Sequence, residues 1–216
     1  MFDKGNLNEM KMKRNWNERY SIADYVYGEE PNEYFKATLA NLHPGKILLP
    51  ADGEGRNGVY AATQGWEVEA FDQSEQAREK ALQLAQRKGV RINYQVLDFQ
   101  QIYDTYPKEN FDAIALIFAH MPPEIKSGYF PQLPDLLKPG GHILLEGFSK
   151  NHVTYQQKNP GIGGPPDVEM MYSEELMREL FPDLEIITLS EQEISLNEGL
   201  GHNGLGSVVR YIGKKR

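Results

Sequence analysis

The stretch that organises this chain is KILLPADGEGRN, residues 46–57. An apolar run at 47–49 leads to a proline and then to a loop that holds Gly53 and Gly55, after which helix-forming residues resume at Val59. This order predicts a strand, a tight loop and a helix. Glycines let such a loop turn sharply and approach a ligand, and the amides at the start of the helix can bind its polar groups. We therefore expect a cofactor site here.

The glycine spacing by itself is weak evidence for a cofactor. Gly53, Gly55 and Gly58 match the G-x-G-x-x-G spacing of a dinucleotide site, but a chain with 20 glycines in 216 residues produces such spacings by chance. The residues that follow later predicted strands strengthen the case.

Two of these residues are acids. Residues 66–72 alternate in polarity and end in Asp72, close to the roughly 20-residue interval at which dinucleotide folds place a carboxylate on a ribose. Asp72 also fits a helix cap beside Ser74. Residues 91–97 predict the next strand, which ends at Asp98. Since ligands of open α/β sheets bind at the carboxyl ends of the strands, we expect the loop and both acids to meet in one crevice.

The remaining pattern alternates strands and helices, which predicts a doubly wound, Rossmann-like α/β fold. The most hydrophobic strand, 111–119, is expected at the centre of a mostly parallel sheet, and it leads to His120. Residues 123–137 predict one helix, and 184–194 with 207–212 predict an antiparallel C-terminal hairpin. Residues 148–172 lack periodicity and predict a flap over the substrate.

The composition limits the function classes. The chain of 216 residues has a net charge of −8, its basic residues are dispersed, and it contains no cysteine. This argues against nucleic acid as a partner and excludes disulfides and a cysteine nucleophile. No apolar run approaches the roughly 20 residues that span a bilayer, and no secretory signal is evident, so we expect a cytoplasmic protein without a membrane segment. The sequence does not choose between monomer and homodimer.

The predicted organisation is a flexible tail at 1–14 followed by one domain at 15–216. Within the domain we expect a lid and helix at 15–45, a cofactor-binding core at 46–150, and a flap and hairpin at 151–216. The aromatic segment, defined here as residues 16–35, holds six aromatic side chains. These either pack on the domain surface or form a lid over a planar or cationic ligand.

The ordered set of motifs resembles class I S-adenosylmethionine-dependent methyltransferases, in particular the tellurite-resistance-type and thiopurine-type small-molecule enzymes. The resemblance extends over nearly the whole chain after residue 15. The motifs that carry it are WNERY at 16–20, YVYG at 25–28, GEGRN at 53–57, Asp72, Asp98, FDA at 111–113, KPGG at 138–141 and YS at 172–173. The resemblance implies a seven-stranded sheet whose last strand is antiparallel, in agreement with the predicted hairpin.

The resemblance also implies S-adenosylmethionine as cofactor and assigns roles to residues. The loop would hold the methionine part, Asp72 the ribose hydroxyls and Asp98 with Phe99 the adenine. The expected cofactor-binding residues are Arg19, Ala51, Asp52, Gly53, Gly55, Asn57, Asp72, Gln73, Asp98, Phe99 and Ala119. No metal site is expected.

This chain departs from the family at the loop. The family usually has an acid at the position of Leu49 and a glycine at that of Ala51. Asp52 follows three positions after Leu49, and we hypothesise that it supplies the missing charge.

The acceptor is expected to be a small molecule, and a thiol and a selenium or tellurium oxyanion are the candidates. An alcohol or amine acceptor needs a base, for which His120 and His202 are the candidates. An NAD(P)-dependent reductase and a non-catalytic S-adenosylmethionine-binding protein are the alternatives.

Overall fold

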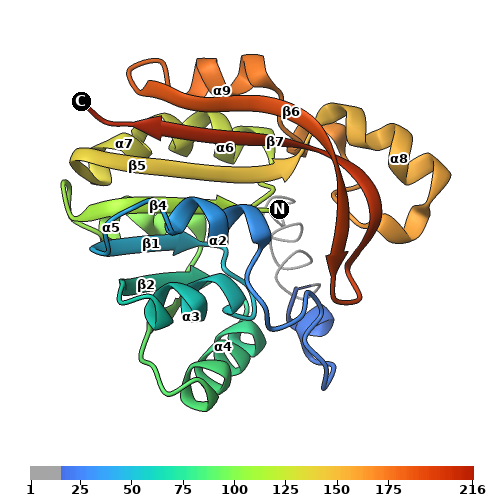
Figure 1. The fold of residues 1–216 in the computed structure, drawn as a ribbon, viewed down its shortest axis with the longest axis horizontal. Coiled ribbons are helices and arrows are strands. Elements are labelled where there is room, and N and C mark those ends of the chain that lie inside the picture. Colours follow the sequence, from blue (N-terminus) through green and yellow to red (C-terminus); the bar gives the residue numbers. More distant parts are fainter. Residues whose placement is uncertain (1–15) are drawn as a thin grey trace, which may run out of the picture.

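The computed structural model describes residues 16–216, so the tail predicted at 1–14 lies outside the described residues. A seven-stranded sheet in the order β3-β2-β1-β4-β5-β7-β6 forms the centre of the molecule (Figure 1). Strands β1 to β5 are paired in parallel, and β7 lies antiparallel to both of its neighbours, β5 and β6. The predicted fold class is therefore confirmed. The strands are β1 Lys46–Pro50, β2 Glu67–Asp72, β3 Asn93–Val96, β4 Phe111–Ile117, β5 Leu137–Phe148, β6 Glu185–Glu198 and β7 His202–Lys214.

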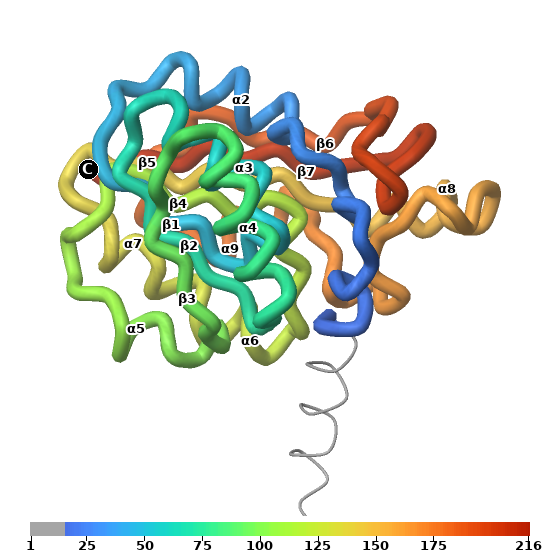
Figure 2. Tube along the Cα trace, turned by 90° about the horizontal axis from the view of Figure 1, so that it is seen from below, coloured from blue at the N-terminus to red at the C-terminus, as the bar shows by residue number. Residues whose placement is uncertain are grey.

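Helices cover both faces of the sheet (Figure 2). One face carries α2 Glu33–Leu39, α3 Arg56–Thr63 and α4 Glu75–Arg87, whereas the other carries α5 Ile102–Thr105, α6 Pro123–Tyr129, α7 Leu133–Leu136 and α9 Glu174–Leu180. Asn32, Ser74 and Ser173 cap α2, α4 and α9, because each side-chain oxygen accepts a bond from an amide of the first turn.

Two apolar layers hold the sheet. The layer under α2, α3 and α4 includes Phe35, Leu49 and Ala81, and the opposite layer includes Phe111, Phe130 and Tyr211. Central β4 contributes to both layers, as expected for a parallel strand that is buried on both faces. Leu49, at the position of the family's acid, is 1% exposed and belongs to this core.

Three expectations about the elements were wrong. The predicted helix 123–137 breaks into α6, a 3-10 turn at Phe130–Gln132 and α7, because Pro131 and Pro134 have no amide hydrogen to donate. The hairpin strands are longer than predicted. The segment 148–172 is not structureless, since it holds α8 Val153–Lys158 and three 3-10 turns.

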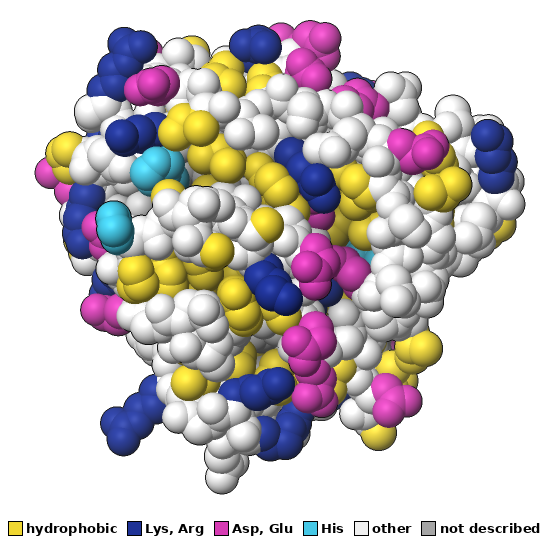
Figure 3. Space-filling view, in the orientation of Figure 1, with side chains coloured by type: hydrophobic (Ala, Val, Ile, Leu, Met, Phe, Trp, Pro, Cys, Tyr) yellow, Lys and Arg dark blue, Asp and Glu magenta, His cyan; other side chains and the backbone are white. Residues whose placement is uncertain are grey.

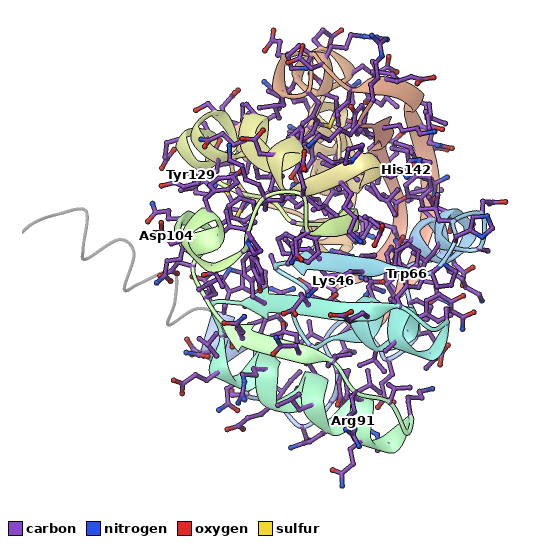
Figure 4. The ribbon with its side chains drawn as sticks, turned by 90° about the vertical axis from the view of Figure 1, so that its left-hand side faces the viewer. Lys46, Trp66, Arg91, Asp104, Tyr129 and His142 are labelled. Atoms are coloured by element: carbon purple, nitrogen blue, oxygen red, sulfur yellow. The ribbon has the colours of Figure 1, made fainter. Side chains whose placement is uncertain are left out.

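The two ends of the parallel strands have different surroundings. Figure 4 views the amino ends, where Lys46 begins β1, Trp66 precedes β2 and His142 lies in β5. The Lys46 ammonium group forms ion pairs with Glu67 at 3.0 Å and Glu69 at 3.3 Å, which link β1 to β2 at this end of the sheet. The cavity described next lies at the opposite, carboxyl ends of these strands.

Candidate functional site

A cavity of about 710 Å³ lies at the carboxyl ends of the parallel strands. This volume is within the range of about 300–1,000 Å³ that is typical of small-molecule sites. Of the residues predicted for the site, twelve line it: Arg19, Ala51, Asp52, Gly53, Asn57, Asp72, Gln73, Asp98, Phe99, Ala119, His120 and His202. The loop after β1, the acids after β2 and β3, and both histidines therefore converge as the strand-end argument predicted.

The loop after β1 is strongly turned. Ala51, Gly53 and Gly55 all have positive φ angles, of 54°, 59° and 85°. A side chain at Gly53 would come within 2.8 Å of the Tyr20 hydroxyl, so glycine keeps this part of the cavity wall open. Gly55 is not among the lining residues. Its missing Cβ instead lets α3 pack on α4, because a Cβ there would lie 2.5 Å from that of Ala81.

Asp52 is bonded within the loop. Its carboxylate accepts the amide of Gly58 in the first turn of α3 at 3.1 Å. Burial raises the pKa of this carboxyl to about 8, against the opposing effect of the Gly58 bond. Asp52 therefore helps to fix the loop to α3 even though the family's acid is replaced by Leu49.

Asp72 joins two strand ends. Its two oxygens accept the amides of Ser74 at 3.0 Å and Gly53 at 3.2 Å. Burial raises the pKa of Asp72 to about 6, and these amide bonds oppose the shift. Each carboxylate oxygen has a second lone pair, so the side chain can also accept from a ligand hydroxyl in the cavity.

The cavity wall beyond Asp72 is apolar with polar margins. Phe99 lies edge-on to Phe71, with 6.1 Å between ring centroids, and stacks on Phe130 at 5.2 Å. Leu97, Met121 and Ile125 are the neighbouring apolar lining residues, and Gln73, Asp98 and Gln100 provide polar groups. Such a slot can hold a flat heterocycle and accept hydrogen bonds from its amine.

The aromatic segment covers the cavity. Glu54 accepts the amide of Val26 at 2.8 Å and pairs with Lys80 at 2.7 Å, which ties the segment to the glycine loop and to α4. The Arg19 guanidinium lies 5.8 Å from the ring centroid of Trp16 and 5.4 Å from that of Tyr27. Within residues 16–216, Arg19 forms no ion pair with a carboxylate.

The β6–β7 hairpin completes the cover. In Figures 1 and 2 its tip bends away from the sheet and meets the aromatic segment. The amides of Leu200 and Gly201 donate to the carbonyl of Val26 at 2.8 and 3.0 Å. The ring of His202 lies 4.6 Å from that of Tyr27. Segments from both ends of the described chain thus share one wall of the site.

His202 pairs with Glu198 across the hairpin turn. The distance from Nδ1 to the Glu198 carboxylate is 3.0 Å. Burial lowers the pKa of His202, although the bond to Glu198 opposes this shift, so the ring is neutral at pH 7. Burial alone would raise the pKa of Glu198, but the bond from His202 and the charge of Arg56 hold it at about 2.

His120 has no nitrogen left for a substrate. Its Nε2 accepts the amide of Phe148 at 3.1 Å, so Nδ1 carries the hydrogen and donates to the carbonyl of Met170 at 3.2 Å. Burial lowers the pKa of His120 to about 3. The structure therefore favours His202 over His120 as the base. His152 is held in the same way, between the amide of Ser207 and the carbonyl of Gly163.

Two aromatic lining residues were missed in the sequence. Phe118 follows β4 with a φ angle of 51°, and its ring lies 4.5 Å from His202 and 4.8 Å from Phe148, at the end of β5. A positive φ in a large side chain is strained, and such strain is concentrated at functional sites. The strand-end argument that selected Asp72 and Asp98 applies equally to both phenylalanines.

Comparisons with known proteins agree with this arrangement. Residues 47–141 match the family model described as a methyltransferase domain. No curated protein is similar enough in sequence to match the chain.

Solved structures share the fold at low sequence identity. The chain is similar to the protein in a structure described as "Conversion of a Disulfide Bond into a Thioacetal Group during Echinomycin Biosynthesis", with 18% identity, a TM-score of 0.72, and coverage of 94% of this chain and 91% of that one. TehB from Haemophilus influenzae is 16% identical with a TM-score of 0.64, and the match covers 94% of this chain and 67% of TehB. Magnesium protoporphyrin IX methyltransferase from Synechocystis PCC 6803 was solved with bound SAH (S-adenosylhomocysteine). It is 15% identical with a TM-score of 0.61, and the match covers 100% of this chain and 89% of that one.

The match identifies a methyltransferase domain at residues 47–141, and the fold is shared with solved S-adenosylmethionine-dependent methyltransferases. The resemblance seen in the sequence is confirmed, and the reductase alternative is set aside. S-adenosylmethionine is the cofactor that the resemblance implies, and the similar magnesium protoporphyrin IX methyltransferase was solved with bound SAH. The site fits such a ligand, because Gly53 keeps the loop wall open, Asp72 has free lone pairs and an apolar slot lies beside it.

Proposed function

We propose that this enzyme transfers the methyl group of S-adenosylmethionine to a small-molecule acceptor. The observation that carries the proposal is one covered cavity with two chemically different ends. One end has the acids and the apolar slot after β2 and β3, and the other has aromatic rings around His202. The aromatic segment and the hairpin tip cover this cavity and leave room for a small acceptor.

The residues that line the first end suit the parts of the cofactor. We assign Asp72 to the ribose hydroxyls with Gln73 beside it, and Asp98 with Phe99 to the adenine. Arg19 is assigned to the carboxylate of the methionine part, since its guanidinium contacts rings but no carboxylate within residues 16–216. Ala51, Gly53, Asn57 and Ala119 line the same cavity.

The surface also favours a small acceptor over a nucleic acid. On the face shown in Figure 3, Lys and Arg side chains alternate with Asp and Glu, and no continuous basic stripe crosses that face. The net charge of −8 points in the same direction. None of the helices in residues 16–216 has the length and apolarity that crossing a bilayer requires.

The similar structures concern different acceptors. One is described by the formation of a thioacetal from a disulfide, which is sulfur chemistry, and another is named for magnesium protoporphyrin IX. These names support a small molecule, and among small molecules a sulfur acceptor is one candidate.

The test is to follow a radiolabelled methyl group from S-adenosylmethionine in a size-fractionated cell extract. We expect label in molecules that pass a small-pore filter. Label found only in protein or nucleic acid would contradict the proposal. Asp72→Asn should abolish transfer, and Asp104→Asn, an exposed carboxylate near the opposite end of the strands (Figure 4), is the matched control that should retain it.

A further inference from the structure

The Glu198 carboxylate that pairs with His202 accepts hydrogen bonds from three side chains. Besides His202 Nδ1, the Glu198 carboxylate accepts Nη2 of Arg56 at 2.8 Å and Nδ2 of Asn32 at 2.9 Å. Three donors on one carboxylate keep it ionised and fixed in position. An ionised carboxylate can only accept, so the hydrogen of the neutral imidazole lies on Nδ1 and the lone pair on Nε2.

Nε2 of His202 is the nitrogen left for a ligand. It makes no hydrogen bond to any residue in 16–216, and His202 lines the cavity. His120 and His152, in the same cluster of rings, use both nitrogens on backbone groups. Of these three histidines, only His202 can exchange a proton with a bound molecule.

The surroundings of that nitrogen are apolar rings. The centroid of His202 lies 4.6 Å from Tyr27, 4.5 Å from Phe118 and 5.1 Å from Phe148. Gly163 packs close enough that a Cβ there would lie 2.9 Å from the His202 ring. These walls suit an apolar or planar acceptor whose single polar group points at Nε2.

The charges that face His202 come from several elements. One cation facing the ring is Arg56, which is already paired with Glu198 and bonded to the carbonyl of Tyr27. Arg19 also faces the ring, but we assign it to the carboxylate of the cofactor, so an anionic acceptor beside Glu198 would find both cations engaged. The titratable and charged groups facing the ring are Arg19, Tyr27, Arg56, His120, His152 and Glu198.

We propose that His202 Nε2 is the general base of this enzyme, that Glu198 is its positioning residue, and that the acceptor is a neutral weak acid with an S–H or O–H group, a thiol or a phenol. The inference rests on the proposed function and narrows its acceptor class, because selenium and tellurium oxyanions need no base, and at this end Arg56 is paired with Glu198 while Arg19 is assigned to the carboxylate of the cofactor.

The step balances without a further reactant. As the S–H or O–H bond of the acceptor breaks, its proton passes to Nε2, and the electron pair of that bond is shared in the new bond to the methyl carbon. The pair of the broken carbon–sulfur bond returns to the cofactor's sulfur. The imidazolium formed is stabilised by Glu198 and then releases its proton to water.

The test compares His202→Gln and Glu198→Gln with wild type on a panel of alkyl thiols, aryl thiols and phenols, with selenite and tellurite as the oxyanion arm. SAH affinity is measured for each variant to show that the site is intact. His43→Gln is the matched control, since His43 is exposed and is not among the residues lining the cavity.

We expect turnover of at least one thiol or phenol, and a fall in kcat of about 10²–10⁴-fold in His202→Gln with SAH affinity kept within threefold. Glu198→Gln should lower kcat less and move the acid limb of the pH–rate profile, which a purely structural role would not do. Methylation confined to the oxyanions, full activity in His202→Gln, or SAH binding with no thiol or phenol methylated would each overturn the inference. Absence of SAH and S-adenosylmethionine binding in wild type would instead refute the proposed function.

Discussion

The amide of Gly53 donates to the Asp72 carboxylate at 3.2 Å, which joins the loop after β1 to the end of β2. The two strands are paired in parallel, and Pro50 is in register with Phe71. This bond holds the proposed methionine end and the proposed ribose end of the cofactor site in one fixed geometry.

Cofactor affinity is expected to depend on the protonation of Asp72. Burial raises its pKa to about 6, so a growing fraction is protonated as the pH falls through 6 and loses acceptor capacity. We predict that SAH affinity, measured by calorimetry, falls roughly tenfold between pH 7.5 and pH 5, since a charged hydrogen bond is worth about 1.5–3 kcal/mol. Asp72→Asn should bind weakly with little change across this range. An affinity in wild type that is flat with pH would contradict the assigned role.

Asp52→Asn should stabilise the free protein at neutral pH. The pKa of Asp52 is raised from 3.8 in the unfolded chain to about 8, so between these values the unfolded state loses a proton that the folded state keeps. Stability is therefore lost as pH rises, by up to about 1.4 kcal/mol per pH unit. Asparagine can still accept the Gly58 amide without this loss.

Thermal unfolding at pH 4 and pH 7.5 checks this prediction. The gain in Tm of Asp52→Asn over wild type should be several degrees larger at pH 7.5. The same variant tests the hypothesis that Asp52 replaces the family's acid, because unchanged affinity for S-adenosylmethionine would rule that hypothesis out.

Ala51→Gly is expected to stabilise the protein by about 1 kcal/mol. Ala51 has a φ of 54°, where a Cβ is disfavoured by about 1–2 kcal/mol, and the greater freedom of glycine in the unfolded chain offsets part of the gain. Urea unfolding of the two proteins measures the difference. Ala61→Gly, in the interior of α3, is the control and should destabilise. A loss of stability in Ala51→Gly would mean that the loop is not strained at this position.

His120 should matter for stability at acid pH and much less for turnover than His202. Its pKa is lowered from 6.5 to about 3, so below pH 6.5 the unfolded chain binds a proton that the folded protein does not. Wild type should lose up to about 1.4 kcal/mol per pH unit from this group as the pH falls. Urea midpoints from pH 7 to pH 4 should fall more steeply for wild type than for His120→Gln. Loss of turnover in His120→Gln as large as in His202→Gln, at equal SAH affinity, would contradict the assignment of the base.

Much of this architecture could be predicted because it rests on local rules. The loop glycines, Asp72 and Asp98 all follow strands, and parallel strands bring their carboxyl ends to one edge. The pairing of Glu198 with His202 could not be predicted, because it depends on a hairpin longer than its apolar pattern indicates and on a bend that carries the tip to Val26. The bonds that occupy both nitrogens of His120 come from Phe148 and Met170, and only the folded chain brings these residues to it.

The most direct test of the central claim is calorimetric titration of the purified protein with S-adenosylmethionine, SAH and NADH side by side. The account predicts micromolar binding of the two adenosyl ligands, no binding of NADH, and loss of adenosyl binding in Asp72→Ala. Binding of NADH alone, or no binding of any of the three, would contradict it.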